Sequence, residues 1–263
     1  MLTWRTERQA TALALIVFIL LSITGWIAYW TYPASTCFDN RKNQQETEIY
    51  CGGSCVPCEL KNPKPINLLW ARIVPVRPDV YDVAAEIKNP NEVLGASTVD
   101  YEFTLFDNFG VIARKVGQTF LFPQERIHVI ETGLRTTRKP IRVEFRVLKE
   151  HWLLVQGEKI PHIVVERRDY RVVRDGERKK GVVEASILNK TSFDYHEVLV
   201  NFVVRDAKDN ALAVNRVLLE NLNANSRKTV TSIWPEELKG EVTKVDVEPR
   251  VNTFEMDTTK RMR

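Results

Sequence analysis

The pattern of hydrophobic and polar positions divides the chain into an N-terminal apolar run, a short cysteine-rich stretch and a long alternating region. The apolar run carries no charged side chain over the thirty residues between Arg8 and Asp39. Within it, residues 10–30 supply 21 positions, which rise about 31 Å in a helix and match the hydrocarbon core of a bilayer. The pattern therefore predicts a transmembrane helix over residues 10–31.

The residues that flank this helix predict its orientation. Arg5 and Arg8 precede it, and an interfacial aromatic belt closes its far end: Trp26, Tyr29, Trp30 and Tyr32. The positive-inside rule then leaves the N-terminus in the cytoplasm and the chain from about residue 33 outside. A cleaved signal peptide is the alternative, but its apolar core is usually about 7–15 residues long and ends in small residues. Residues 34–36 (AST) end in threonine, which favours an uncleaved anchor.

From residue 66 onward, Val, Ile, Phe, Tyr and Thr alternate with polar residues in short runs separated by turn residues. Alternation with a period of two is typical of strands that bury one face. The clearest runs are 99–106 (VDYEFTLF), 141–147 (IRVEFRV) and 197–204 (EVLVNFVV). The pattern predicts a mainly β fold after the membrane helix, with one buried face on each strand.

The alternating region repeats after about 100 residues. Residues 84–89 (AAEIKN) align with 183–189 (VEASILN), and residues 103–107 (FTLFD) align with 202–206 (FVVRD). This period predicts two immunoglobulin-like sandwiches of about seven strands each. Neither copy contains cysteine, so each core relies on packing alone. If residues 156–161 form a linker, the two copies should unfold in separate thermal transitions.

Four cysteines lie within 22 residues, and the chain has no others: Cys37, Cys51, Cys55 and Cys58. Either a zinc ion bound by four thiolates or two disulfides would use them all. A structural zinc site usually pairs two C-x-x-C elements, and only Cys55 and Cys58 have that spacing. The predicted outside location is oxidising, which favours two disulfides, although four cysteines allow three pairings.

Residues 36–46 (TCFDNRKNQQE) and 50–58 (YCGGSCVPC) resemble a bacterial cell-surface module with the pattern C-x-D-G-x-x-N-x-x-E-x-x-x-D-C-G-G-x-C-x-x-C. Two positions depart from it, since Asn40 replaces a usual Gly and Tyr50 a usual Asp. Three side chains with oxygen atoms form a candidate Ca²⁺ site: Asp39, Asn43 and Glu46. The alternative is that Asp39 and Asn43 cap turns in a disulfide knot.

The segment from Phe103 to Asp107 resembles the FxLYD family of small β-sandwich domains in bacterial extracytoplasmic proteins. The resemblance covers about residues 66–253 and implies the same sandwich fold twice, with no catalytic residue to transfer. In the second copy, Phe202 and Asp206 occupy the matching positions, but Arg205 replaces the family's aromatic residue. Each Phe should fill a sandwich core, and each Asp should accept backbone N–H groups in the turn that follows.

The charge is spread thinly along the chain. With 38 basic and 34 acidic residues the net charge is +4, which argues against a nucleic-acid-binding protein. Residues 167–180 contain seven basic side chains, but four acidic ones lie within or beside this stretch, from Glu166 to Glu177. A solvated hairpin surface explains this stretch, and an anionic partner or lipid headgroups are the alternative.

Motifs that carry catalysis are scarce. The histidines show no metal-binding spacing, and we expect each at the surface: His128, His151, His162 and His196. There is no G-x-S-x-G elbow and no Gly-rich phosphate loop. The sequence therefore predicts no catalytic residue, no cofactor and no enzyme.

Together these patterns predict a cytoplasmic N-terminus (1–9), a transmembrane helix (10–31), a Cys-rich module (32–65), two β-sandwiches (66–155 and 156–253) and a polar basic tail (254–263). The expected function is that of a membrane-anchored, extracytoplasmic interaction or structural protein of the cell envelope. Its expected partners are the lipid bilayer, through residues 10–31, and a protein of the envelope. An accessory or sensory subunit of a membrane assembly or secretion complex is the alternative.

Overall fold

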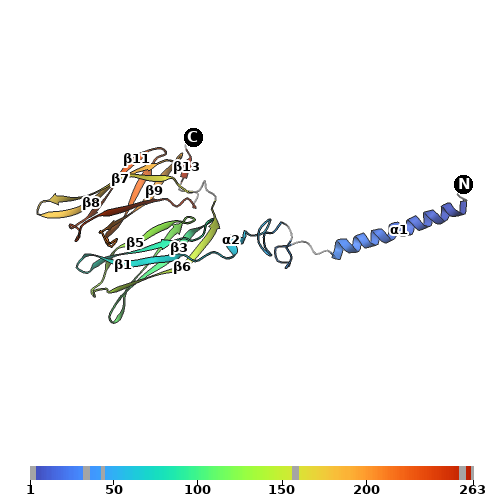
Figure 1. Cartoon of the computed structure of the whole chain (residues 1–263), viewed down its shortest axis with the longest axis horizontal. Helices are drawn as coiled ribbons and strands as arrows, with labels where there is room; N and C mark the ends of the chain where they lie inside the picture. Colours follow the sequence, from blue (N-terminus) through green and yellow to red (C-terminus); the bar gives the residue numbers. More distant parts are fainter. Residues whose placement is uncertain (1–3, 32–35, 43–44, 156–159, 255–258, 262–263) are drawn as a thin grey trace. The chain divides into compact units, whose positions relative to one another are not determined.

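A computed structural model describes residues 4–31, 36–42, 45–155, 160–254 and 259–261. The chain divides into two compact units, Met1–Lys61 and Asn62–Arg263. In Figure 1 the first unit contains the labelled helices and the second contains the labelled strands. The units are described separately below.

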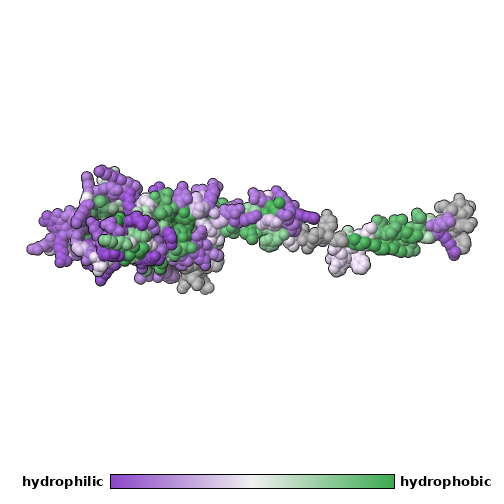
Figure 2. Space-filling view, turned by 90° about the horizontal axis from the view of Figure 1, so that it is seen from below, coloured by the Kyte–Doolittle hydropathy of each residue, from purple (hydrophilic) through white to green (hydrophobic). Residues whose placement is uncertain are grey.

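The first unit begins with helix α1, Trp4–Thr31. Its segment Glu7–Trp30 is long and apolar enough to cross a membrane, and none of that segment is buried against the rest of the chain. Figure 2 shows the middle of α1 in the green of hydrophobic residues, with purple at its N-terminal end. A signal sequence near an N-terminus has the same properties, so the helix is suited to membrane insertion or to export. A four-residue helix, α2, spans Cys58–Lys61.

The second unit consists of two consecutive sets of six strands. The first set is β1 Asn67–Arg77, β2 Val80–Lys88, β3 Leu94–Asp107, β4 Gly110–Leu121, β5 Arg126–Arg135 and β6 Arg142–Leu154. The second set is β7 Ile163–Asp175, β8 Arg178–Asn189, β9 Phe193–Arg205, β10 Ala211–Leu222, β11 Arg227–Trp234 and β12 Lys244–Arg250. A short strand β13, Thr259–Arg261, pairs with the start of β9.

Both sets have the same topology. Sheets β1-β2-β5 and β4-β3-β6 form the first sandwich, and sheets β7-β8-β11 and β10-β9-β12 form the second. All strand pairs are antiparallel. The predicted mainly β fold with two sandwich-like units is confirmed. Among the described residues, the first sandwich has six strands, one fewer than expected, and the second has seven when β13 is counted with β9.

Each sandwich has its own apolar core. The side chains of Phe103 on β3 and Phe202 on β9 are completely buried, and each lies in the core of its own sandwich. Asp107 and Asp206 then begin the next turns, where their carboxylates accept backbone N–H bonds from Phe109 and from Lys208. Apolar side chains at alternate positions of one strand meet those of the facing sheet, which explains why this pattern makes a sandwich.

A buried asparagine closes the same corner of each sandwich. Nδ2 of Asn89 donates to the carbonyl oxygens of Leu94 and Phe122, at 2.7 and 2.9 Å. Nδ2 of Asn189 donates equivalently to Phe193 and Leu222, at 2.8 and 3.4 Å. Both side chains are 0% exposed. The duplication therefore includes a polar bridge as well as an apolar core.

The two sandwiches share a third apolar cluster, which joins the outer face of sheet β1-β2-β5 to the outer face of sheet β10-β9-β12. Its buried members are Val74, Ala84, Ile130, Val203 and Val214. Four sheets are thus stacked within this unit, and the two middle sheets are covered on both faces. The prediction of one buried face per strand is wrong for β2 and β9, because the other sandwich covers their second face.

Candidate functional site

Residues 36–61, called the knot below, contain both disulfides. Cys37 is bonded to Cys55 and Cys51 to Cys58, with Cα–Cα distances of 5.6 and 4.8 Å. The prediction of two disulfides between residues 37 and 58 is confirmed, and the pairing that the sequence left open is settled. All four sulfur atoms are bonded in pairs, so none is available as a thiolate to bind zinc.

A tight backbone turn holds the second disulfide. Gly52 has φ +88°, and a Cβ atom there would lie 2.4 Å from Oγ1 of Thr47. The Gly52 N–H donates to the carbonyl of Val56 at 2.9 Å, and the Cys55 N–H donates to the carbonyl of Gly52 at 3.0 Å. Only glycine fits this conformation and this space.

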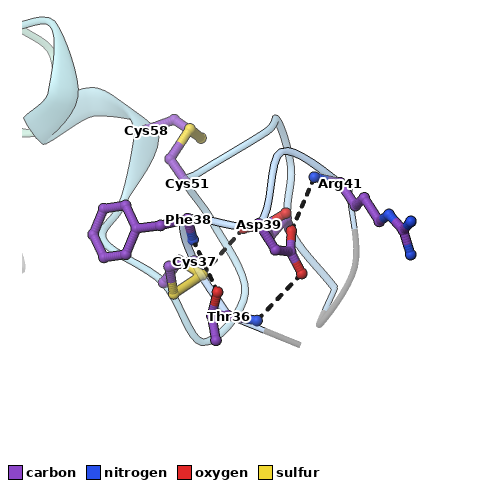
Figure 3. The surroundings of a disulfide bond; sticks show 9 residues. Thr36, Cys37, Phe38, Asp39, Arg41, Cys51 and Cys58 are labelled. Carbon is purple, nitrogen blue, oxygen red and sulfur yellow. Dashed lines mark hydrogen bonds between the residues drawn. A yellow bond between two sulfur atoms is a disulfide. The ribbon is translucent and has the colours of Figure 1, made fainter. Parts of the chain in front are cut away.

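The candidate calcium ligands lie in the first loop of the knot. The carboxylate of Asp39 accepts the backbone N–H of Thr36 at 3.3 Å and that of Arg41 at 2.9 Å, as Figure 3 shows. Glu46 is buried, with its Oε1 3.2 Å from the sulfur of Cys55. Asn43 lies outside the described residues. The Ca²⁺ site therefore stays a prediction, while Asp39 has the contacts of a turn-capping residue.

One side of the knot exposes apolar side chains. Phe38 is 84% exposed and Val56 is 58% exposed. With Tyr50 and Lys61 they line a shallow hollow of about 330 Å³. The rings of Phe38 and Tyr50 stack at 6.5 Å, and Nζ of Lys61 lies 5.2 Å above the Tyr50 ring. We call these four side chains the apolar patch.

In the second unit, a charged cluster lies where the two sandwiches meet. Its centre is His128 on β5, which is only 4% exposed, so the expectation of a surface position is wrong for this histidine. The side chain of His128 points out of its own sandwich and is covered by β9 and β12 of the other. The other three histidines are exposed, at positions 151, 162 and 196.

Hydrogen bonds fix the ring of His128. Its Nδ1 lies 2.6 Å from Oε1 of Glu248, and its Nε2 lies 2.7 Å from Nη2 of Arg205. Arginine can only donate, so Nε2 accepts and the Nδ1–H donates to the carboxylate of Glu248. The backbone is held too, because Nδ2 of Asn201 donates to the His128 carbonyl at 2.7 Å.

Two carboxylates complete the cluster. Burial opposes the charge of Glu86, but hydrogen bonds from Arg126 and Trp70 outweigh it and hold the pKa of Glu86 below its usual value. Burial likewise opposes the charge of Asp246, yet its bonds with Lys244 and Arg205 lower the pKa of Asp246. Both carboxylates remain ionised at neutral pH and are bound to cations. Carboxylates bound in this way can stabilise the contact between the sandwiches, and they are poorly suited to abstract a proton from a substrate.

A second buried arginine joins the sandwiches at another point. Nη1 of Arg250 on β12 donates to Oγ1 of Thr119 at 3.2 Å, and its Nη2 donates to the carbonyl of Phe120 and to Glu125. The guanidinium also lies 4.2 Å from the centre of the Phe120 ring. Nothing in the sequence pattern indicates this role of Arg250, because a lone arginine at a strand end carries no signal.

The basic stretch 167–180 forms the hairpin of β7 and β8. Two of its cations make exposed ion pairs, Arg171 with Glu184 at 3.0 Å and Lys179 with Glu237 at 3.0 Å. Arg168 instead lines a charged hollow of about 280 Å³ beside His128.

No protein-family model and no curated protein matches the sequence. Among solved structures, a GH2 beta-galacturonidase from Eisenbergiella tayi bound to galacturonate aligns with a TM-score of 0.23 and 10% identity, over 72% of this chain and 41% of that chain. A GH2 beta-galacturonidase from the same organism bound to glycerol gives a TM-score of 0.20 and 10% identity, over 68% and 37%. The tandem CBM22 domains of Paenibacillus barcinonensis Xyn10C give a TM-score of 0.13 and 8% identity, over 73% and 89%.

These likenesses are distant. The chain spans about two-fifths of the length of the two galacturonidases. TM-scores this low carry no argument about function.

Proposed function

We propose that this chain is a membrane-anchored, extracytoplasmic interaction or structural protein of the cell envelope, without enzymatic activity. The observation that carries the proposal is the unburied apolar segment Glu7–Trp30, followed within 30 residues by two disulfides. An apolar helix of this length matches the hydrocarbon core of a bilayer, which supports anchoring. Disulfides persist in the oxidising space beyond a cytoplasmic membrane, so they support an outside location for the knot and the sandwiches.

The proposal includes the two family resemblances, which residues of the first sandwich and of the knot support. Phe103 and Leu105 are buried on one strand and Asp107 begins the next turn, as the FxLYD pattern requires. In the knot, Asn40 stands where the surface module has glycine, and its φ of +61° is one that glycine and asparagine accept. The other departure, Tyr50, donates its hydroxyl to Oδ1 of Asn40 at 2.9 Å, so the two departures compensate each other.

Three measurements test the proposal. Sodium carbonate should leave the full chain in the membrane fraction, and protease added to intact spheroplasts should digest residues 60–263. Release by carbonate, or protection from protease, would contradict the anchored topology. Chemical cross-linking followed by detergent extraction should then recover the chain with an envelope partner through its sandwiches. Recovery in a stoichiometric complex with an integral membrane protein would favour the accessory-subunit alternative.

A further inference from the structure

We propose that the apolar patch of the knot docks on the lipid bilayer, at the boundary between headgroups and acyl chains on the side where α1 emerges. This inference rests on the proposed membrane anchoring and adds a second contact with the same membrane. In this proposal two segments contact lipid: α1 spans the bilayer, and the knot lies on its surface.

The chemistry of the patch fits that boundary. Phe38 and Val56 present apolar groups, while Tyr50 and Lys61 combine an apolar body with a polar end. Aromatic rings and lysines that extend their charge toward water are typical of membrane interfaces. Figure 3 shows the ring of Phe38 and the guanidinium of Arg41 pointing to opposite sides of the loop. Phe38 and Arg41 thus give this loop one apolar side that can face lipid and one charged side that can face water.

The covalent tether brings the patch to the membrane. Phe38 follows Thr31, the end of α1, by seven positions, so their Cα atoms lie at most about 25 Å apart even in a fully extended chain. A tethered surface needs little affinity of its own, because its effective concentration at the membrane is already high. Three or four side chains are therefore sufficient for docking.

A protein partner is a poorer occupant for this patch. Stable protein–protein interfaces use about 20–30 residues on each side, and the apolar patch has four. Within its own unit, the described residues of the knot form only the isolated bridge of Glu48 with Cys51, which offers no long strand edge for pairing with a second copy. Lipid requires no such area, since a tethered interfacial contact only adds to an existing anchor.

Photo-cross-linking in the full chain tests this docking. The replacement Phe38→p-benzoylphenylalanine keeps an aromatic ring at an exposed position. The chain is reconstituted in vesicles of phosphatidylcholine and phosphatidylglycerol that contain an alkyne-tagged phosphatidylcholine, and adducts are detected after illumination. The same replacement at Phe109, which is 90% exposed in the β3–β4 turn, is the matched negative control. Replacement of Leu20, 57% exposed on α1, is the positive control for anchoring.

We expect the probe at position 38 to label lipid at a yield roughly tenfold above the probe at position 109, as a tethered contact predicts. A probe at Val56 should behave like that at Phe38, and its yield should fall when Phe38→Asp is added. Lipid labelling at position 20 but not at positions 38 and 56 would overturn the docking and leave the anchor intact. Absence of labelling at position 20 would overturn the proposed anchoring itself. Adducts of positions 38 and 56 with protein, including a second copy, would overturn lipid as the occupant. Intact mass without reduction checks that each variant retains both disulfides.

Discussion

The two sandwiches share their interior and differ on the faces that meet. Strand β3 of the first and β9 of the second align through their buried Phe residues, 99 positions apart. On the outer face of β3, Glu102 is only partly buried, while its counterpart on β9 is the buried Asn201. Likewise Phe106 is partly exposed, while its counterpart Arg205 is 3% exposed and bonded to Asp246.

Sheets β1-β2-β5 and β7-β8-β11 show the reverse contrast: here the outer face of the first sandwich is buried in the contact and that of the second sandwich is not. In the first sandwich Glu86 pairs in register with His128, and both are buried in the contact. In the second sandwich the equivalent pair is Ser186 with Thr229, and Thr229 is exposed. The repeats therefore keep the residues that fold each copy, and they differ where one copy binds the other. Arg205, which departs from the FxLYD pattern, belongs to this contact and not to the core.

The strongest test of the shared interior is truncation of its two phenylalanines. Phe103→Ala and Phe202→Ala should each lower the free energy of unfolding by about 3–5 kcal/mol, because each leaves a cavity in a closed core. Urea denaturation of the full chain in detergent, followed by intrinsic fluorescence, measures the loss. A cost below about 1 kcal/mol at either site would show that the two cores are not equivalent.

The same experiment tests the independence of the copies. The sequence predicted separate transitions, but the shared cluster and buried ion pairs of the contact couple the two sandwiches. We expect either substitution to shift one common transition. Two resolved transitions, with only one of them shifted, would restore the independent domains of the sequence analysis.

A second test addresses the face that differs. Arg205→Ala leaves Asp246 and Nε2 of His128 without their buried donor, and should cost about 2–3 kcal/mol, somewhat less than a fully buried ion pair. The matched control is Arg142→Ala in the first sandwich, whose ion pair with Glu144 is exposed and should contribute less than about 0.5 kcal/mol. Equal effects of the two substitutions in thermal unfolding would remove the proposed distinction between the face that meets the other sandwich and the exposed face.

The buried asparagines sharpen the comparison of the interiors. Asn89→Ala and Asn189→Ala each remove a buried amide that donates to backbone carbonyls, and should each cost about 1–3 kcal/mol. Similar losses of unfolding free energy in chemical denaturation would show that the two asparagines stabilise their sandwiches equally, as their matching hydrogen bonds suggest. As a control, Asn223→Ala changes an exposed side chain close to Asn189 and should be nearly neutral.

The smallest effect concerns Asp82, on the outer face of β2. Burial raises the pKa of Asp82 to about 6, against the hydrogen bond from the Gly133 N–H, which lowers it. Between about pH 4 and pH 6 the folded chain holds a proton that the unfolded chain has lost, so this contribution to stability falls as the pH rises through 6. Asp82→Asn keeps an oxygen acceptor for Gly133 but does not titrate.

Asp82→Asn should therefore match the parent chain near pH 4 and exceed it by about 1–2 kcal/mol at pH 7.5, after allowance for screening by solvent. Denaturation curves at both pH values measure this difference. A variant less stable than the parent at pH 7.5 would mean that the charged carboxylate stabilises the contact.

Much of the interior could be predicted from the sequence, because alternation reports which face of a strand is apolar. That signal identified Phe103 and Phe202, and the clustered cysteines predicted both disulfides but not their pairing. The burial of Glu86 and His128 could not be predicted, because alternation does not report whether water or another domain covers the polar face of a strand. One clue was present in Val203 and Val204, because consecutive apolar residues are typical of strands buried on both sides.

The contact between the copies also has a consequence for polymerisation. The first copy binds through its β2 sheet and the second through its β9 sheet, which is a head-to-tail arrangement that does not close on itself. A third copy would have to stack on the free face of β3 or of β8. Those faces carry Asp100, Glu102 and Glu184, and placing their charges in a dry contact would be costly. A further sandwich stacked there would need cations for these carboxylates, as Arg126 binds Glu86 and Arg205 binds Asp246 in the existing contact.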